Sequence, residues 1–173
     1  VYLSEYFGLP EVANFWEGVV KLNFWHQDRI SQLVVKKLFG TVSGKKIAIL
    51  GFAFKANTND TRESASIKIC KDLLEEGANL SIHDPKVDSE QIAKDLKLDE
   101  KKSLQVKDLI PENIYEGTWS FSDEIFDSIK NADAVLVLTE WEEYTNIDWT
   151  KVSKLMRKPS WIFDARSIID PNK

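Results

Sequence analysis

The sequence predicts an α/β fold: a doubly wound, Rossmann-like parallel sheet in a three-layer α/β/α arrangement, preceded by a long helix. Short apolar runs, such as Ile47–Leu50 and Ala134–Leu138, alternate with stretches of helical period. These runs are almost uniformly apolar, as expected for strands buried on both faces of a parallel sheet. Before them, residues 10–39 carry an unbroken helical pattern.

The predicted long helix runs from Pro10 to Phe39. Proline suits the first helical turn, and Gly40 suits a stop. Apolar side chains recur along it at helical spacing and include Phe15 and Trp16. At ~45 Å, such a helix is longer than one small domain needs. We therefore expect it to link two bodies or to form a dimer, and an ordinary core helix is the alternative.

Strands and helices alternate beyond Gly44. Strands are predicted at 45–50, 79–83, 134–138 and 161–163, and helices at 64–76, 89–96, 122–131 and 148–156. Glu63 or Ser64 is expected to cap the first of these helices. Residues 97–117 are predicted to form a charged, irregular connection. The expected domain organisation is a helical linker or dimerisation region at 1–43 and an α/β domain at 44–173.

Composition narrows the classes of function. The 173 residues are 43% apolar, enough for one core, and the net charge of −5 argues against a general nucleic-acid binder. Cys70 is the only cysteine, which excludes an intrachain disulfide and favours a reducing, cytoplasmic compartment. It falls on the buried side of a predicted helix and is expected to be an inert core thiol. No apolar run reaches the ~20 residues of a membrane span, and no spacing suggests a metal site.

The loops that follow the predicted strands form the candidate site, because doubly wound sheets bind ligands beyond the carboxyl ends of their strands. These loops are residues 51–62, 84–87, 139–141 and 164–167. The first lacks the G-x-G-x-x-G spacing, so we do not expect it to hold a dinucleotide in the usual way. It carries Lys55, and Arg166 holds the matching place after the last strand. Two converging cations predict a diphosphate or an anionic sugar as ligand. His83 is expected to be a rim or capping residue.

Each candidate residue has a structural alternative. Phe54 could pack against a base or ribose, or it could fill the core, and the sequence does not separate the two. Lys55 could be an ordinary surface lysine. Arg62 lies at a predicted helix N-terminus, where a cation is electrostatically unfavourable and needs an anionic partner. That partner is either a ligand or Asp60 in a structural ion pair.

Residues 51–64 (GFAFKANTNDTRES) resemble the signature of the UDP-glucose/GDP-mannose dehydrogenase family. Further matches are residues 83–87 (HDPKV), 139–141 (TEW) and 163–166 (FDAR). The resemblance covers nearly the whole chain, and its motifs fall on the loops that topology selects. It implies an enzyme with an N-terminal NAD-binding domain, a central dimer-forming helix and a C-terminal domain that binds the nucleotide sugar.

Enzymes of this family oxidise the C6 alcohol of the sugar to a carboxylate, with two NAD and a cysteine-bound intermediate. For this chain the resemblance implies substrate contacts from Phe54, Lys55 and Arg166 and an NAD contact from Arg62. It also implies a homodimer or higher homo-oligomer that assembles through the helix at 10–39.

The chain departs from the family pattern in two respects. The nucleophilic cysteine would lie just upstream of Val1, Cys70 does not match it, and the glycine-rich NAD-binding strand is missing. We therefore expect the C-terminal part of the enzyme, without a catalytic residue and inactive alone. Ala165 stands where the family usually has glycine. Overall resemblance favours UDP-glucose as the substrate. UDP-N-acetylmannosamine and GDP-mannose are alternatives, as is a dimerisation module without activity.

Overall fold

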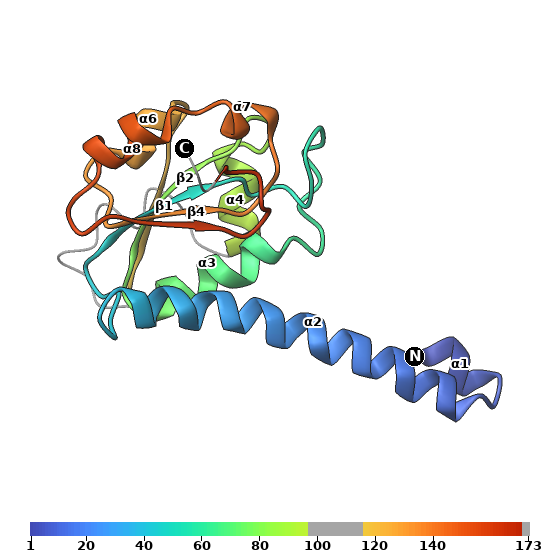
Figure 1. The fold of residues 1–173 in the computed structure, drawn as a ribbon. Helices are drawn as coiled ribbons and strands as arrows, with labels where there is room; N and C mark the ends of the chain where they lie inside the picture. The colour runs from blue at the N-terminus through green and yellow to red at the C-terminus, as the bar shows by residue number, and fades with distance from the viewer. Residues whose placement is uncertain (97–115, 171–173) are drawn as a thin grey trace, which may run out of the picture.

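A computed structural model describes residues 1–96 and 116–170 (Figure 1). The elements are α1 (Tyr2–Tyr6), α2 (Pro10–Lys37), β1 (Lys46–Leu50), α3 (Ala65–Glu75), β2 (Asn79–His83), α4 (Ser89–Leu96), β3 (Thr118–Phe121), α6 (Ile125–Ile129), β4 (Ala134–Val137), α7 (Glu142–Thr145), α8 (Trp149–Leu155) and β5 (Trp161–Asp164).

The five strands form one parallel sheet in the order β3-β2-β1-β4-β5. The chain moves outward from β1 to β3 and then returns to the other side of β1, where β4 begins the second half. Leu50, the last residue of β1, pairs with His83 of β2 and with Val137 of β4. The order therefore reverses between β1 and β4, which is where doubly wound sheets bind their ligands.

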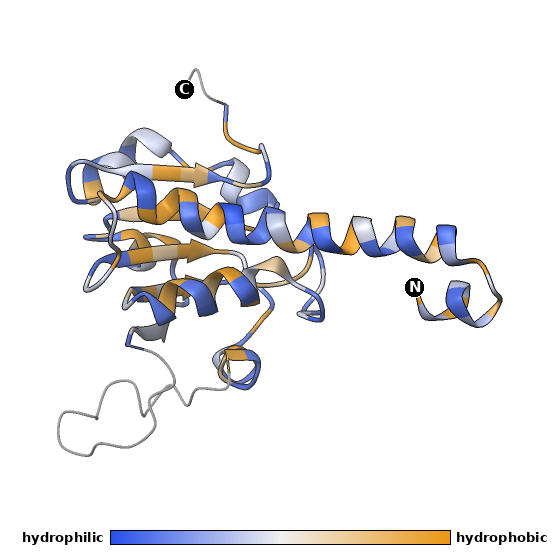
Figure 2. Cartoon of the chain, turned by 90° about the horizontal axis from the view of Figure 1, so that it is seen from below, coloured by the Kyte–Doolittle hydropathy of each residue, from blue (hydrophilic) through white to orange (hydrophobic). Residues whose placement is uncertain are grey.

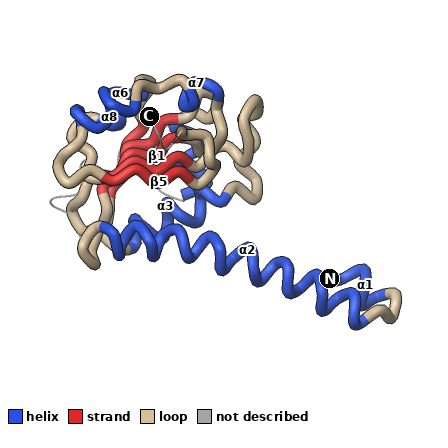
Figure 3. The backbone as a smooth tube through the Cα atoms, in the orientation of Figure 1, coloured by secondary structure: helices blue, strands red, loops and turns tan. Residues whose placement is uncertain are grey.

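Helices cover both faces of the sheet (Figure 3). Helices α6, α7 and α8 lie over one face, and α3 lies against the other with α2 beyond it (Figure 1). The strands β1 and β4 are almost wholly buried between these layers. Trp119 and Tyr144 are the bulkiest of the fully buried side chains among the described residues. The predicted fold class is confirmed.

Helix α3 begins as its sequence predicts. Ser64 is the N-cap, with extended backbone, and its hydroxyl oxygen accepts a hydrogen bond from the N–H of Ser66 at 3.3 Å. The same hydroxyl donates to the carbonyl of Phe52 at 2.8 Å. Ser66 in turn donates to the carbonyl of Gly51 at 3.1 Å. The cap therefore joins the start of α3 to the loop that follows β1.

Helix α2 matches its prediction within two residues at its C-terminal end. Ser31 and Val34, near that end, are buried against the domain, whereas the N-terminal part projects away from it with α1 folded back at the tip (Figure 1). Apolar bands continue along this projecting part (Figure 2). None of the helices within residues 1–96 and 116–170 combines the length and apolar character that a membrane crossing requires.

Two elements were not predicted. Strand β3 is four residues long and only its Trp119 is buried, so its pattern is too short to reveal a period. Helix α7 is a single turn that follows β4. The helix predicted at 122–131 is shorter, because α6 spans only Ile125–Ile129. Most of the irregular connection predicted at 97–117 lies outside the described residues.

Candidate functional site

The candidate site lies at the carboxyl ends of β1 and β4, where the strand order reverses. Gly51 turns the chain at the end of β1 with a φ of +96°, a conformation that favours glycine. Its N–H donates to the carbonyl of His83 at 2.9 Å, and the hydroxyl of Thr139 donates to the carbonyl of Ala53 at 2.8 Å. Loops from three neighbouring strands are thus bonded together.

Asp84 is the central polar residue beneath these loops. Its side chain is buried, and its Oδ2 accepts hydrogen bonds from the main-chain N–H of Phe52 at 2.7 Å and of Ala53 at 2.9 Å. Trp141 Nε1 donates to the same oxygen at 3.2 Å. The other oxygen, Oδ1, accepts from the N–H groups of residues 86–87. One carboxylate therefore fixes the loops that follow β1, β2 and β4.

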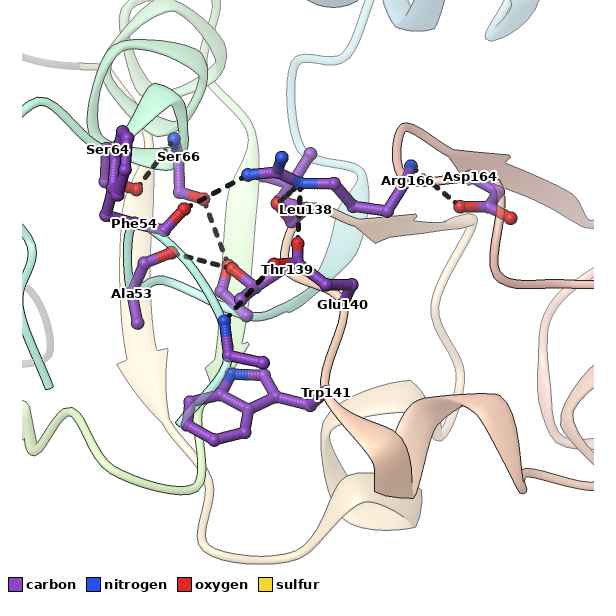
Figure 4. Close-up of polar contacts among 12 residues, drawn as sticks. Ala53, Phe54, Ser64, Ser66, Leu138, Thr139, Glu140, Trp141, Asp164 and Arg166 are labelled. Atoms are coloured by element: carbon purple, nitrogen blue, oxygen red, sulfur yellow. Dashed lines mark hydrogen bonds and ion pairs between the residues drawn. The ribbon is translucent and has the colours of Figure 1, made fainter. Parts of the chain in front are cut away.

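Arg166 reaches across the carboxyl end of the sheet to the loop that follows β1 (Figure 4). Its Nε donates to the carbonyl of Leu138 at 2.7 Å, and its Nη2 donates to the carbonyl of Phe54 at 3.2 Å. Glu140 Oε2 lies 3.3 Å from the same Nε. The loops after β1, β4 and β5 therefore meet at this guanidinium, and Arg166 lies next to the segment that carries Lys55, as predicted.

Phe54 and Lys55 point away from the core. The side chain of Phe54 is 48% exposed, which excludes the core-filling role that the sequence left open. Lys55 is exposed as well, and its ammonium has no partner among the described residues. The main-chain N–H of Phe54 donates to the carbonyl of Asp60 at 2.8 Å, which closes the loop. An exposed ring and an unpaired cation therefore lie on consecutive residues of the loop whose main chain Arg166 contacts.

Arg62 forms an ion pair with Asp60, the structural alternative that the sequence allowed. Nε lies 2.9 Å from one carboxylate oxygen and Nη2 lies 2.7 Å from the other. This bidentate contact lowers the pKa of Asp60 to about 2. The Arg62 side chain remains 87% exposed. Among the described residues, none forms a hydrogen bond with Nη1 of Arg62. The predicted NAD contact stays a prediction.

His83 is buried, so its predicted place at the rim is wrong. Its Nδ1 lies 2.9 Å from the hydroxyl of Tyr144, and that hydroxyl also donates to the His83 carbonyl at 3.1 Å. This pair could not be predicted from the sequence, because Tyr144 lies in a one-turn helix far along the chain. The role of Asp84 was missed too, since an Asp-Pro sequence after a strand reads simply as a turn.

Cys70 is fully buried in α3, and burial raises the pKa of its thiol. The prediction of an inert core thiol is confirmed, because a neutral, inaccessible thiol is not a nucleophile.

The stability of the chain is expected to fall when the pH drops below about 6.5, the ordinary pKa of histidine. Burial lowers the pKa of His83, although the carboxylate of Asp84 opposes the shift. A depressed folded-state pKa means that the stabilisation is complete above the unfolded-state value and is lost as the pH falls towards the folded-state value.

Urea unfolding at pH 8 and pH 5.5 measures this effect, and His83→Gln should reduce the difference between the two. His26→Gln, on the exposed face of α2, is the matched control and should leave the difference unchanged. An equal pH dependence in wild type and His83→Gln would contradict the assignment.

Comparison with known proteins identifies a family to which the α/β domain is similar. The family model described as the UDP-glucose/GDP-mannose dehydrogenase family, UDP binding domain, matches residues 48–171. That range contains all four loops at the carboxyl ends of the strands. The match therefore falls on the α/β domain and leaves out α1 and α2.

Two relatives match almost the whole chain. UDP-glucose 6-dehydrogenase 4 of Arabidopsis thaliana is 43% identical over an alignment of 178 residues, which covers 100% of this chain and 36% of that protein. UDP-glucose 6-dehydrogenase of Drosophila melanogaster is 44% identical over 98% of this chain and 34% of its own length. The chain thus spans about a third of the relatives it matches.

The fold has solved counterparts. A UDP-glucose dehydrogenase from Pyrobaculum islandicum superposes with a TM-score of 0.67 at 23% identity, over 96% of this chain and 32% of that one. At this identity the likeness speaks for the fold alone. Because the family model covers most of the chain, the identification rests on that match: the chain belongs to the UDP-glucose/GDP-mannose dehydrogenase family, and its residues 48–171 correspond to the family's UDP binding domain.

Proposed function

We propose that this chain is the UDP-sugar-binding part of a UDP-glucose 6-dehydrogenase, an enzyme that oxidises UDP-glucose to UDP-glucuronate with two NAD. The observation that carries the proposal is the hydrogen bond from Arg166 to the main chain of the loop that carries Phe54 and Lys55, at the switch point of the sheet. The 43% identity to a named UDP-glucose 6-dehydrogenase supports it. UDP-N-acetylmannosamine and GDP-mannose are the alternative substrates of the same class.

Each of the three residues has a distinct part in the proposal. The unpaired ammonium of Lys55 supplies a point charge for a phosphate. The exposed ring of Phe54 offers an apolar face to the sugar or the ribose. Arg166 is anchored by Nε and Nη2, which leaves Nη1 for the ligand. Domain 44–173 carries the site, and we assign no catalytic residue to it, since the thiol of Cys70 is inaccessible.

Lys55→Ala is expected to weaken UDP binding by about tenfold, equivalent to ~1.4 kcal/mol, because it removes the unpaired cation of the site. Calorimetric titration of the chain with UDP, UDP-glucose and GDP measures the effect. The control is Lys94→Ala, which makes the same charge change at an exposed position on α4. Failure of a well-folded wild-type chain to bind either uridine nucleotide would contradict the proposed function, and preference for GDP would favour the GDP-mannose alternative.

Arg62 is proposed to contact NAD held by another part of the enzyme. Its 87% exposure and its pre-formed pair with Asp60 support this role, because the pair holds the guanidinium outward from the loop. Substitution by alanine should raise the KM for NAD of an enzyme that contains both domains and leave UDP binding unchanged.

The lone buried thiol of Cys70 fits a reducing, cytoplasmic compartment.

The projecting part of α2 is proposed to form a homodimer. Phe15 and Trp16 are 65% and 51% exposed, and Val12 and Val20 on the same helical face are 42% and 45% exposed. An apolar face of this kind is typical of an interface between subunits. Residues 1–43 then form the assembly region of the chain, and residues 44–173 form the ligand-binding region.

Trp16→Asp is expected to convert a dimer into a monomer, because a buried charge would replace an aromatic anchor at the interface. Sedimentation velocity at micromolar concentration measures the change. Asn14→Asp adds the same carboxylate on the opposite face of the helix and should leave the dimer intact. A wild-type chain that sediments as a monomer would rule out the proposed interface.

A further inference from the structure

Glu140 contacts two parts of the proposed ligand site, the loop after β1 and the side chain of Arg166. It follows β4 and lies between the loop after β1 and the side chain of Arg166 (Figure 4). Its Oε1 accepts a hydrogen bond from the main-chain N–H of Ala56 at 3.4 Å. Its Oε2 is buried and lies 3.3 Å from Arg166 Nε. One carboxylate thus touches the residue after Lys55 and the guanidinium opposite it.

The charge of Glu140 is electrostatically unfavourable for the proposed ligand. A carboxylate beside a diphosphate site repels the ligand, because like charges in a partly buried site are only weakly screened. A neutral glutamine could still accept the bond from Ala56. The negative charge therefore needs a compensating benefit, and the structure offers one at Arg166.

The guanidinium of Arg166 is held by acceptors on two loops. Nε donates to the carbonyl of Leu138 at 2.7 Å, and Nη2 donates to the carbonyl of Phe54. Glu140 Oε2 adds an ion pair with Nε at 3.3 Å. An arginine side chain has many rotamers, and fixing it costs conformational entropy. Acceptors that hold the side chain before the ligand arrives remove this cost from the binding step.

We propose that Glu140 is a positioning residue of the UDP-sugar site, an inference that rests on the proposed function of that site. Its carboxylate fixes the plane of the Arg166 guanidinium and, through Ala56, the loop that carries Phe54 and Lys55. The three ligand-contacting side chains are thereby held in one arrangement. The gain from this order exceeds the repulsion between the carboxylate and the diphosphate.

The proposal and simple electrostatics predict opposite signs for Glu140→Gln. Loss of the negative charge alone would tighten UDP binding, whereas loss of positioning weakens it. We expect UDP binding to weaken by about fivefold to tenfold. Glu142→Gln makes the same charge change at an exposed position in the first turn of α7 and should leave affinity unchanged or slightly raise it.

Glu140→Asp keeps the charge and shortens the reach, and it should weaken binding as well, because geometry and not charge is required. Calorimetry with UDP on the whole chain measures all three variants, with equal melting temperatures as evidence of intact folding. UDP affinity equal to or tighter than wild type in Glu140→Gln would overturn the proposal.

A second readout does not depend on the ligand. In the ligand-free chain, Glu140→Gln should speed hydrogen exchange at Arg166 Nε, as observed by NMR, and Glu142→Gln should not. Unchanged exchange at Arg166 Nε would overturn the positioning role. If the wild-type chain fails to bind UDP, the proposed function fails, and the exchange data still decide whether Glu140 orders the guanidinium.

Discussion

Replacement of Asp84 by alanine is expected to lower the free energy of unfolding by about 3–5 kcal/mol. The substitution removes the acceptor for the main-chain N–H groups of Phe52 and Ala53 and for the indole N–H of Trp141. All three residues are buried, so water does not readily replace the lost bonds. Asp84→Asn should fall between wild type and alanine, because the amide still offers one acceptor.

Urea unfolding measures this loss. The matched control is Asp88→Ala, because Asp88 is exposed and its side chain accepts a hydrogen bond from Gln91 at the start of α4. We expect a cost of about 1 kcal/mol there, as for other helix caps. Equal losses at the two positions would show that Asp84 does not hold the loops as described.

Gly51→Ala is expected to cost a similar amount, about 3–5 kcal/mol, for two additive reasons. The φ of Gly51 is +96°, which strains any residue with a Cβ. A Cβ at this position would also collide with the side chain and the main-chain nitrogen of Thr139, at 2.6 Å from Oγ1 and 2.8 Å from N. Since Thr139 is bonded to Ala53, the collision would disturb the junction of the two loops.

Gly40→Ala separates the two causes. Gly40 has a similar φ of +84°, but no heavy atom lies within 4 Å of the added Cβ. Only the backbone strain applies there, and we expect a loss of about 1 kcal/mol. Chemical denaturation of both variants gives the comparison, and losses that differ by less than the experimental error would exclude the collision with Thr139.

The fold could be predicted because its local signals agree. The apolar runs of β1 and β4, the cap at Ser64 and the stop after α2 each indicate the observed element. The strand β3 was missed because four residues, of which only Trp119 is buried, carry no measurable period. Sequence patterns report burial along one element, and β3 is defined mainly by its pairing with β2.

The candidate site was only partly predictable. Topology alone selected the loops that carry Lys55 and Arg166, because every parallel strand ends at the same edge of the sheet. The residues that organise these loops could not be found in this way. Asp84 and Glu140 act through main-chain N–H groups far away in the sequence, and a carboxylate bonded to main chain leaves no pattern in its surroundings.

Arg62 shows a related limit of sequence-based prediction, because the need for a partner was predicted but the partner was not. The sequence indicated that a cation at this helix start needs an anion, and both Asp60 and a ligand satisfied that requirement. The structure supplies Asp60, two residues away. A local ion pair of this kind is compatible with a further contact between Arg62 and a ligand. The unfavourable charge at the helix start therefore predicts an anionic partner but does not identify it.

UDP is expected to bind at the carboxyl ends of β1 and β4. The most direct measurement is an NMR titration of the chain with UDP-glucose, with the main-chain amide signals assigned. We predict that the largest shifts fall in residues 51–56, 138–141 and 164–167, and that signals of α4 and of the projecting part of α2 stay in place. Saturable shifts centred on any other surface, or no shifts at millimolar ligand, would contradict the account.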